Sequence, residues 1–176
     1  MRSTSADEFR EWVAGARQGM RQTAFLLSGD WFLADDLVQD ALTRLFAVWG
    51  RVTSSGDPAA YARRVLLNIY LDHQRRPSRR EESRAELPDV PAPDTDPVAR
   101  DHRDHLLAAL REVPPGQRAV LVLRYWEDLS VEQTAAALSI SSGNVKSQSS
   151  RGLDNLRVAL AAATSASPVE PARDPS

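Results

Sequence analysis

The residues best suited to recognition chemistry lie on one side of a stretch near the C-terminal end of the chain. Turned at about 100° per residue, as in a helix, residues 145–160 gather Val145, Gly152 and Leu156 on an apolar side. The opposite side carries donors and cations that suit base edges and phosphates in a DNA major groove: Lys146, Ser147, Ser150 and Arg151. A solvated helix face is the alternative interpretation.

The residues just before this stretch supply a second helix and a turn. Ser130-Val131-Glu132-Gln133 has the pattern of a capping box, which starts a short helix through residue 138. Residues 139–141 then separate the short helix from the longer one. A short helix, a tight turn and a longer polar-faced helix are the elements of a helix-turn-helix, so the combination favours DNA binding.

A second polar face lies in residues 33–49. Leu37, Val38 and Leu45 belong to a wide apolar side of this helix, and the other side gathers Asp36, Gln39, Asp40 and Thr43. Such a face is either solvated or docks a basic partner protein. Paired carboxylates also suit acid–base catalysis, but no further group of residues completes a catalytic site. The sequence therefore predicts a binding protein and not an enzyme.

Residues 61–76 predict a helix that is apolar over most of its circumference. Its polar residues form one narrow stripe, made by Arg64, Asn68, Asp72 and Arg75. Internal pairing, of Asp72 with either arginine, is one explanation. The other is single-strand binding, in which arginines contact phosphates and Asn68, with Tyr61 or Tyr70 nearby, meets unstacked bases.

Composition narrows the class of protein further. The 176 residues include no cysteine, which excludes a disulfide scaffold, a thiolate zinc site and a cysteine nucleophile. We expect a cytoplasmic protein, because the N-terminal residues lack a signal-peptide core and no run approaches the roughly 18 apolar residues of a membrane span. His102 and His105 share a helix face but lack a further convergent ligand, so we expect no metal and no cofactor. A small metal-dependent enzyme is the alternative.

A proline-rich segment divides the chain into two small all-α domains. Apolar periodicity predicts helices over 8–28, 32–49 and 58–75 on one side, and over 103–112, 115–127, 130–138 and 142–162 on the other. The net charge of −2 hides a basic stretch at residues 61–80 followed by an acidic one. The predicted organisation is a helical domain, a flexible acidic linker, a helix-turn-helix domain and a disordered tail: 1–76, 77–102, 103–162 and 163–176.

Three segments together resemble bacterial RNA polymerase sigma factors. "SGDWFLADDLVQDALTRLFAVW" is similar to the helical part of region 2 that docks the polymerase, and "DPAAYARRVLLNIYLDHQRR" to the following part, which opens and recognises the minus-ten element. "LREVPPGQRAVLVLRYWEDLSVEQTAAALSISSGNVKSQSSRGLDNLR" resembles region 4, which recognises the minus-thirty-five element. Order and spacing resemble the extracytoplasmic-function (ECF) group, in the style of its SigE-like actinobacterial members.

This resemblance implies partners and a role for each polar face. The partners would be promoter DNA and core RNA polymerase, through the clamp helices of its beta-prime subunit and the flap of its beta subunit, with an anti-sigma factor as a further candidate. The acidic face, Asp36, Gln39, Asp40 and Thr43, would meet the clamp helices. Asn68 would lie at the pocket of a flipped minus-ten base, beside Arg63, Arg64, Arg75 and Arg76 on the strand backbone. Lys146, Ser147, Ser150 and Arg151 would enter the minus-thirty-five major groove. An independent helix-turn-helix regulator is the runner-up.

Overall fold

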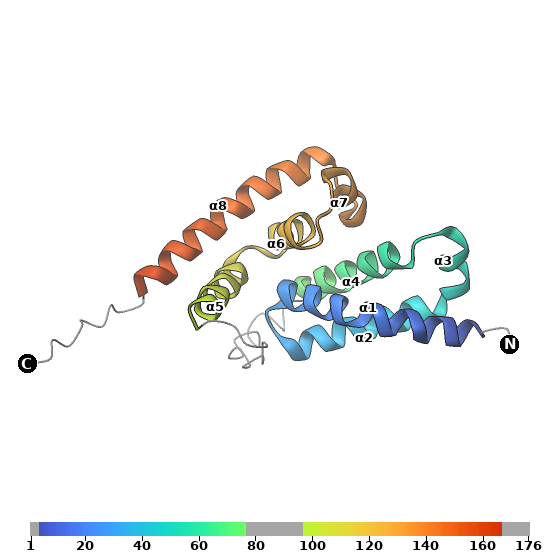
Figure 1. Cartoon of the computed structure of the whole chain (residues 1–176). Coiled ribbons are helices and arrows are strands. Elements are labelled where there is room, and N and C mark those ends of the chain that lie inside the picture. Colours follow the sequence, from blue (N-terminus) through green and yellow to red (C-terminus); the bar gives the residue numbers. More distant parts are fainter. Residues whose placement is uncertain (1–3, 77–96, 167–176) are drawn as a thin grey trace, which may run out of the picture.

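The computed structural model describes residues 4–76 and 97–166, which are helical and contain no strand. The first unit consists of α1 (Ser5–Ser28), α2 (Trp31–Ala47), α3 (Trp49–Ser55) and α4 (Pro58–Arg75). The second unit consists of α5 (Pro97–Glu112), α6 (Pro115–Leu121), the π-helical turn η2 (Val122–Trp126), α7 (Val131–Leu138) and α8 (Ser142–Ala166) (Figure 1). The prediction of two all-α units is confirmed. Residues 77–96 of the predicted linker and 167–176 of the predicted tail lie outside the described residues.

Side chains next to the helices determine where they start. The carboxylate of Asp57 accepts a hydrogen bond from the Ala60 amide at 3.0 Å, and Pro58 takes the first position of α4, where its missing N–H costs nothing. Ser130 and Gln133 form the predicted capping box of α7, each side chain bonding the other's backbone amide, at 3.0 and 2.8 Å. These local signals were readable in the sequence, and they set the residue at which α4 and α7 each begin.

The helix predicted over residues 32–49 is broken in the structure. α2 ends at Ala47, Val48 leaves the helical conformation with φ −122° and ψ 10°, and Trp49 begins α3. The Trp49 ring packs at 5.1 Å from Phe9 and is 5 % exposed. Burying this large ring against α1 turns the chain, and a contact so distant in sequence leaves no trace in local periodicity.

The second unit also differs from the prediction at its helix ends. α5 begins at Pro97 rather than at residue 103, so it extends into the predicted linker, and α8 continues to Ala166, past the predicted end of its helix at 162. Proline is tolerated at the first helical position, which is how Pro97 can start a helix. The helix predicted over 115–127 changes after Leu121 into the π-helical turn η2.

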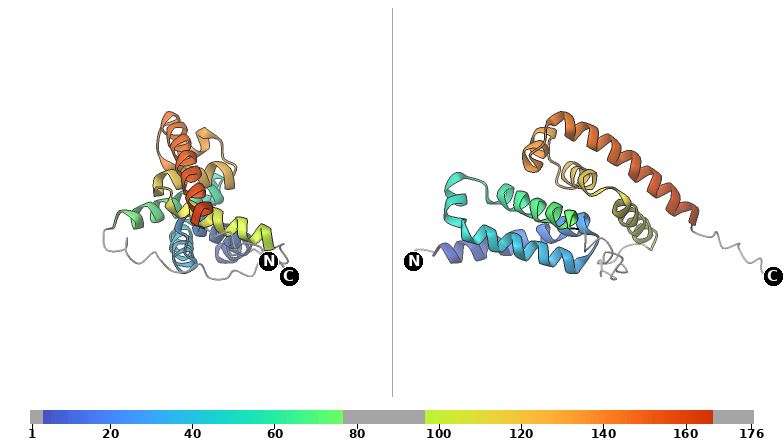
Figure 2. Two further views of the ribbon diagram at one scale, coloured as in Figure 1. Left: turned by 90° about the vertical axis from the view of Figure 1, so that its left-hand side faces the viewer. Right: turned by 180° about the vertical axis from the view of Figure 1, so that it is seen from behind.

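The two units lie against each other, with α8 running along the outer side of the second unit (Figures 1 and 2). A small cluster within the first unit buries Leu45, Trp49 and Val52. The largest cluster is shared: it joins Leu27 and Tyr70 of the first unit with side chains of the second, among them Val113 and Leu123. Hydrophobic burial therefore continues across the boundary between the units.

Candidate nucleic-acid and partner interfaces

The turn between α7 and α8 has the geometry of a helix-turn-helix. Ser139 ends α7 in the left-handed conformation, with φ 55°, and the Ser141 hydroxyl accepts the Asn144 amide at 3.1 Å to start α8. Val145, fully buried, packs in one cluster with Val120 and Ala135, so that α8 is held on the helices before it. The predicted helix-turn-helix is present.

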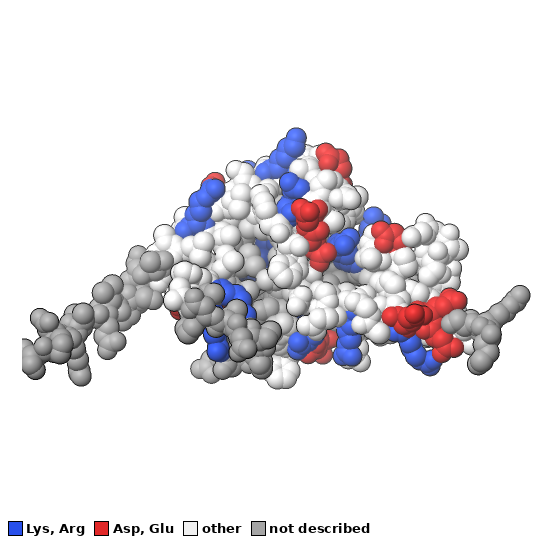
Figure 3. Space-filling model, viewed as in Figure 1, with Lys and Arg blue, Asp and Glu red and all other residues white. Residues whose placement is uncertain are grey.

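The outward side of α8 carries the predicted groove-binding residues. All four side chains are exposed: Lys146, Ser147, Ser150 and Arg151. On the opposite side, a Cβ added to Gly152 would lie 3.1 Å from the Leu121 side chain, which shows how closely α8 approaches α6. This close packing fixes which side of α8 faces outward. In Figure 3, Lys and Arg side chains stand along the upper edge of the molecule, where α7 and α8 lie.

The polar stripe of α4 is exposed along its length. Its four members, Arg64, Asn68, Asp72 and Arg75, all face solvent to a large extent. Arg75 and Asp72 form an exposed ion pair at 3.5 Å, so internal pairing accounts for part of the stripe. Asn68 is available for an external contact. Of the two tyrosines suggested near an unstacked base, Tyr70 is 0 % exposed in the core between the units, where burial raises the pKa of its hydroxyl, so it does not reach a base in this arrangement of the units.

Two neighbouring arginines of α4 contact the second unit: Arg64, the first member of the stripe, and Arg63 beside it. Arg63, predicted to lie near the strand backbone, is half-buried and pairs with Glu127 at 3.2 Å. Arg64 donates to the carbonyl of Ala136 at 3.4 Å. Arg76, at the end of α4, is exposed. The predicted minus-ten arginines thus fall into two pairs. Arg63 and Arg64 contact the second unit, and Arg75 and Arg76 are exposed at the end of α4.

The acidic face of α2 is present as predicted from its periodicity. Asp36, Gln39, Asp40 and Thr43 are all exposed. The Thr43 hydroxyl donates to the Gln39 carbonyl of its own helix at 2.8 Å. A groove of about 460 Å³ lies between α2 and α4 and brings Asp36 and Asp40 to the same depression as Asp72 and Arg76. A partner helix with basic side chains would meet carboxylates on both walls of this groove.

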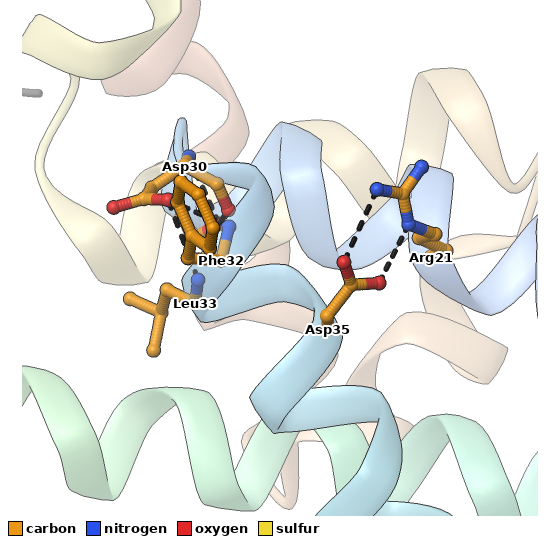
Figure 4. A network of polar contacts seen from close by, with 6 residues as sticks. Arg21, Asp30, Phe32, Leu33 and Asp35 are labelled. Carbon is orange, nitrogen blue, oxygen red and sulfur yellow. Dashed lines mark hydrogen bonds and ion pairs between the residues drawn. The ribbon is translucent and has the colours of Figure 1, made fainter. Parts of the chain in front are cut away.

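Asp35, the neighbour of this face, has a different role. Its carboxylate accepts two hydrogen bonds from Arg21 of α1, at 2.6 and 3.1 Å (Figure 4). The same guanidinium lies 4.2 Å from the centroid of the Trp31 ring. The hydrogen bond from Arg21 is the main cause that holds the pKa of Asp35 below its usual value. At the start of α2, Asp30 accepts the amides of Phe32 and Leu33 (Figure 4). These contacts fix α2 against α1.

Sequence reasoning missed exposed aromatic side chains beside the predicted faces. Phe32 and Phe46 on α2 are 80 % and 52 % exposed, and Tyr125 and Trp126 on η2 are 61 % and 53 % exposed. Phe46 also lines a groove of about 390 Å³ between α1 and α2, together with Gln39 and Thr43 of the acidic face. Both phenylalanines fall outside the apolar stripe of α2, and this position on the helix was the signal in the sequence that they are exposed.

The histidines are not gathered into a metal site. His105 lies 3.4 Å from Asp101 one turn away on α5, and among residues 4–76 and 97–166 no group of three or more His, Asp or Glu side chains could hold a metal ion. None of the helices in the described part of the chain is long and apolar enough to cross a membrane. What the structure presents is a pair of helical units with a helix-turn-helix in the second.

Comparison with known proteins connects each unit to a family. Residues 15–80 match the family described as Sigma-70 region 2, and residues 103–156 match the family described as Sigma-70, region 4. The chain is 37% identical over 157 residues to the RNA polymerase sigma-E factor of Streptomyces coelicolor, covering 88% of this chain and 87% of that protein. It is 37% identical over 147 residues to the ECF RNA polymerase sigma factor SigE of Mycolicibacterium smegmatis, covering 78% of this chain and 56% of that protein.

A solved structure has the same fold over nearly the whole chain. It is the sigma factor RpoE in complex with the anti-sigma factor NepR from Bartonella quintana, with a TM-score of 0.68 and 22% identity, covering 88% of this chain and 97% of that one. The class that the fold defines is a protein of two helical units with a helix-turn-helix in the second. The chain belongs to the sigma-70 family: it is an RNA polymerase sigma factor of the ECF type, which directs transcription initiation. Its partners are core RNA polymerase and promoter DNA.

Proposed function

We propose that this sigma factor contacts a promoter at two places while its first unit is docked on core RNA polymerase. The outward face of α8 enters the major groove of the minus-thirty-five element. The stripe of α4 contacts the separated strand of the minus-ten element, with Asn68 at a flipped base. The acidic face of α2 meets the clamp helices of the beta-prime subunit, and the second unit contacts the flap of the beta subunit. The protein acts in the cytoplasm, by binding and without a reaction of its own.

The observation that carries this proposal is the division of α8 into two sides. Lys146 and Arg151 stand exposed on the second helix of a helix-turn-helix, whereas Val145 and Gly152 are buried against the helices behind it. In proteins of this geometry, the exposed side of the second helix is the one that enters the groove. Arginine and lysine there can donate to guanine edges or to phosphates.

The overall charge supports dependence on the polymerase. A chain with a net charge of −2 attracts DNA weakly, because nonspecific affinity depends on the phosphates that its cations neutralise. When both units are positioned on the polymerase, binding of one site raises the effective concentration of the other. The two sites together then give an affinity that neither unit has alone.

The test uses holoenzyme on promoters selected from a genomic library in a transcription assay. Arg151→Ala should weaken promoter binding by about 1–3 kcal/mol and relax the preference at one or two base pairs if the guanidinium holds a base edge. A phosphate contact would instead weaken all sequences alike and reduce the salt dependence by about one unit of slope. Arg157→Ala is the control, since Arg157 is exposed further along α8 and pairs with Asp154. If both variants bind and transcribe every promoter as the parent does, the proposal is wrong.

An autonomous helix-turn-helix regulator is the second candidate function. The observation in its favour is that the helix-turn-helix is held by its own cluster of Val120, Ala135 and Val145 and so is complete within the second unit. This candidate requires tight and specific binding to duplex DNA without core polymerase. Fluorescence anisotropy on the selected promoters, with and without core polymerase, separates the two functions.

A further inference from the structure

One side chain of the second unit reaches the first unit at the predicted DNA-binding surface. Glu127 follows η2, and its amide donates to the Val122 carbonyl at 3.0 Å, which holds the residue at the end of the π-helical turn. One carboxylate oxygen accepts from the Thr23 hydroxyl of α1. The other lies 3.2 and 3.3 Å from two nitrogens of Arg63 on α4. We call this arrangement the Glu127 contact.

The Glu127 contact is partly buried. The side chains of Arg63 and Glu127 are only 24% and 21% exposed, and Thr23 is 1% exposed. The ion pair is therefore less screened by water and salt than a surface pair would be. Thr23 adds a second donor to the carboxylate, and a hydrogen bond to an ionised acceptor is stronger than one between neutral groups.

Further polar contacts hold the units in the same arrangement. Arg118 of α6 donates to the Leu27 carbonyl of α1 at 2.6 Å, and Arg64 of α4 donates to the Ala136 carbonyl of α7 at 3.4 Å. Gly29, at the end of α1, allows the Arg111 side chain to approach so closely that an added Cβ would lie 2.8 Å from it. Arg63 and Arg64 thus both contact the second unit, Arg64 from an exposed position.

A carboxylate and a phosphate bind a guanidinium in the same way. Both present oxygen atoms that accept hydrogen bonds from the N–H edge of arginine. The edge of Arg63 that would bind the backbone of a separated strand is the edge that Glu127 occupies. Arg64, with its donor directed to Ala136, is likewise turned toward protein. The carboxylate and the phosphate therefore compete for this edge of Arg63.

We propose that the second unit masks part of the minus-ten surface in the free chain, with Glu127 as an internal competitor of the DNA backbone for Arg63. This inference rests on the proposed function, since it takes Arg63 and Arg64 as DNA-binding residues. The free sigma factor is closed and binds single strands weakly. Docking on core polymerase separates the units and releases both arginines. The association constant of the free chain for single-stranded DNA is then that of the open form multiplied by the fraction of molecules that are open.

The first arm of the test measures DNA binding by the free chain. The probe is a fluorescein-labelled, random-sequence single-stranded oligodeoxynucleotide, which does not depend on a known promoter. Glu127→Gln keeps the size of the side chain and removes its charge. We expect it to bind the probe about fivefold more tightly than the parent, the ratio that corresponds to a partly exposed ion pair. Adding Arg63→Ala to the variant should abolish the gain.

Glu132→Gln is the matched control for this arm. Glu132 is an exposed residue of α7, so the substitution makes the same change in net charge on the same unit without touching the Glu127 contact. If Glu127→Gln and Glu132→Gln raise the affinity equally, the gain is a general charge effect and the internal competitor is refuted.

The second arm measures closure without DNA. Because the chain has no cysteine, Gln22→Cys and Tyr125→Cys can carry spin labels at exposed positions close in sequence to Thr23 and Glu127. Double electron–electron resonance should give a short, narrow distance distribution for the free chain and a longer one in the holoenzyme. A free chain that already shows the holoenzyme distribution overturns the closed state. Failure of the proposed function has a different signature: closure is observed, yet Arg63→Ala leaves promoter opening by the holoenzyme unchanged.

Discussion

The interior of the first unit and the contact between the two units are built from different chemistry. Inside the first unit, Leu45, Trp49 and Val52 are buried in a cluster that also packs Phe9 and Trp12, with aromatic rings about 5 Å apart. Between the units, the shared apolar cluster is accompanied by charged groups, and burial lowers the pKa of the Arg118 guanidinium. The interior of the first unit is an apolar core, whereas the contact between the units combines an apolar core with hydrogen bonds and an ion pair.

This difference indicates which contact can open. Apolar surface buried inside one unit is exposed only when that unit unfolds. Separating the units exposes apolar side chains of the shared cluster, but the carbonyls and charges beside them find water or new partners, so that separation costs less than unfolding. Arg118 donates to the carbonyls of Leu27, Arg111 and Val113, and only the first of these belongs to the first unit. The contact between the units is suited to exchange for another partner.

The largest effect is expected from breaking the interior of the first unit. Leu45→Ala removes a side chain that is 0% exposed in the cluster within the first unit and should lower the free energy of unfolding by about 2–5 kcal/mol, because a cavity is added to the lost burial. Leu106→Ala, at a position 45 % exposed, is the control and should change it little. Urea denaturation followed by circular dichroism gives both values. Equal, small losses would mean that the interior of the first unit is not what stabilises it.

A smaller effect is expected from Arg118→Met, which keeps the bulk of the side chain but leaves its carbonyl partners without a donor. We expect a loss of about 1–3 kcal/mol in unfolding free energy and an increased radius of gyration in small-angle X-ray scattering. Arg124→Met is the control, because Arg124 donates to the Leu129 carbonyl within the second unit. If both variants expand the chain equally, Arg118 has no special part in joining the units.

Two buried threonines allow a finer comparison. Thr23 donates to Glu127 across the boundary, whereas the Thr134 hydroxyl is buried without a hydrogen-bond partner among the described residues. Thr23→Val should therefore cost about 1 kcal/mol in unfolding free energy, and Thr134→Val should cost nothing or stabilise the protein. Thermal denaturation of the two variants under one set of conditions measures the difference. The reverse order would contradict the role given to the Thr23 hydroxyl.

The smallest effect is expected at the surface pair of Arg21 and Asp35, which are 32% and 47% exposed. Because the hydrogen bond from Arg21 lowers the pKa of Asp35, the pair stabilises the fold above the unfolded pKa of about 3.9, and this contribution is lost as pH falls through the folded pKa. Solvent screening limits it to below about 1 kcal/mol. The stability difference between the parent and Asp35→Asn, measured by urea denaturation, should be present at neutral pH and vanish in acid. A difference that is independent of pH would contradict this account.

Most of the helices and each polar face could be predicted from the sequence, because both follow from local rules. Capping by Asp57 and Ser130 and the spacing of Lys146 and Arg151 depend only on residues within a few turns. The break at Val48 could not be predicted, since it depends on the packing of Trp49 against α1. The burial of Tyr70 could not be predicted for the same reason, because it depends on side chains of the second unit.

By itself, the sequence determined the periodicity of each helix and hence which residues lie on its polar side. It also determined the family, through segments that match region 2 and region 4. Only the tertiary structure decided that Arg63 and Arg64 contact the second unit, and that Arg63 is partly buried there while Asn68 and Arg75 are exposed. All four lie on one helix. Their environments differ because Glu127 is brought to Arg63 from 64 positions away, by packing between units that no local pattern encodes.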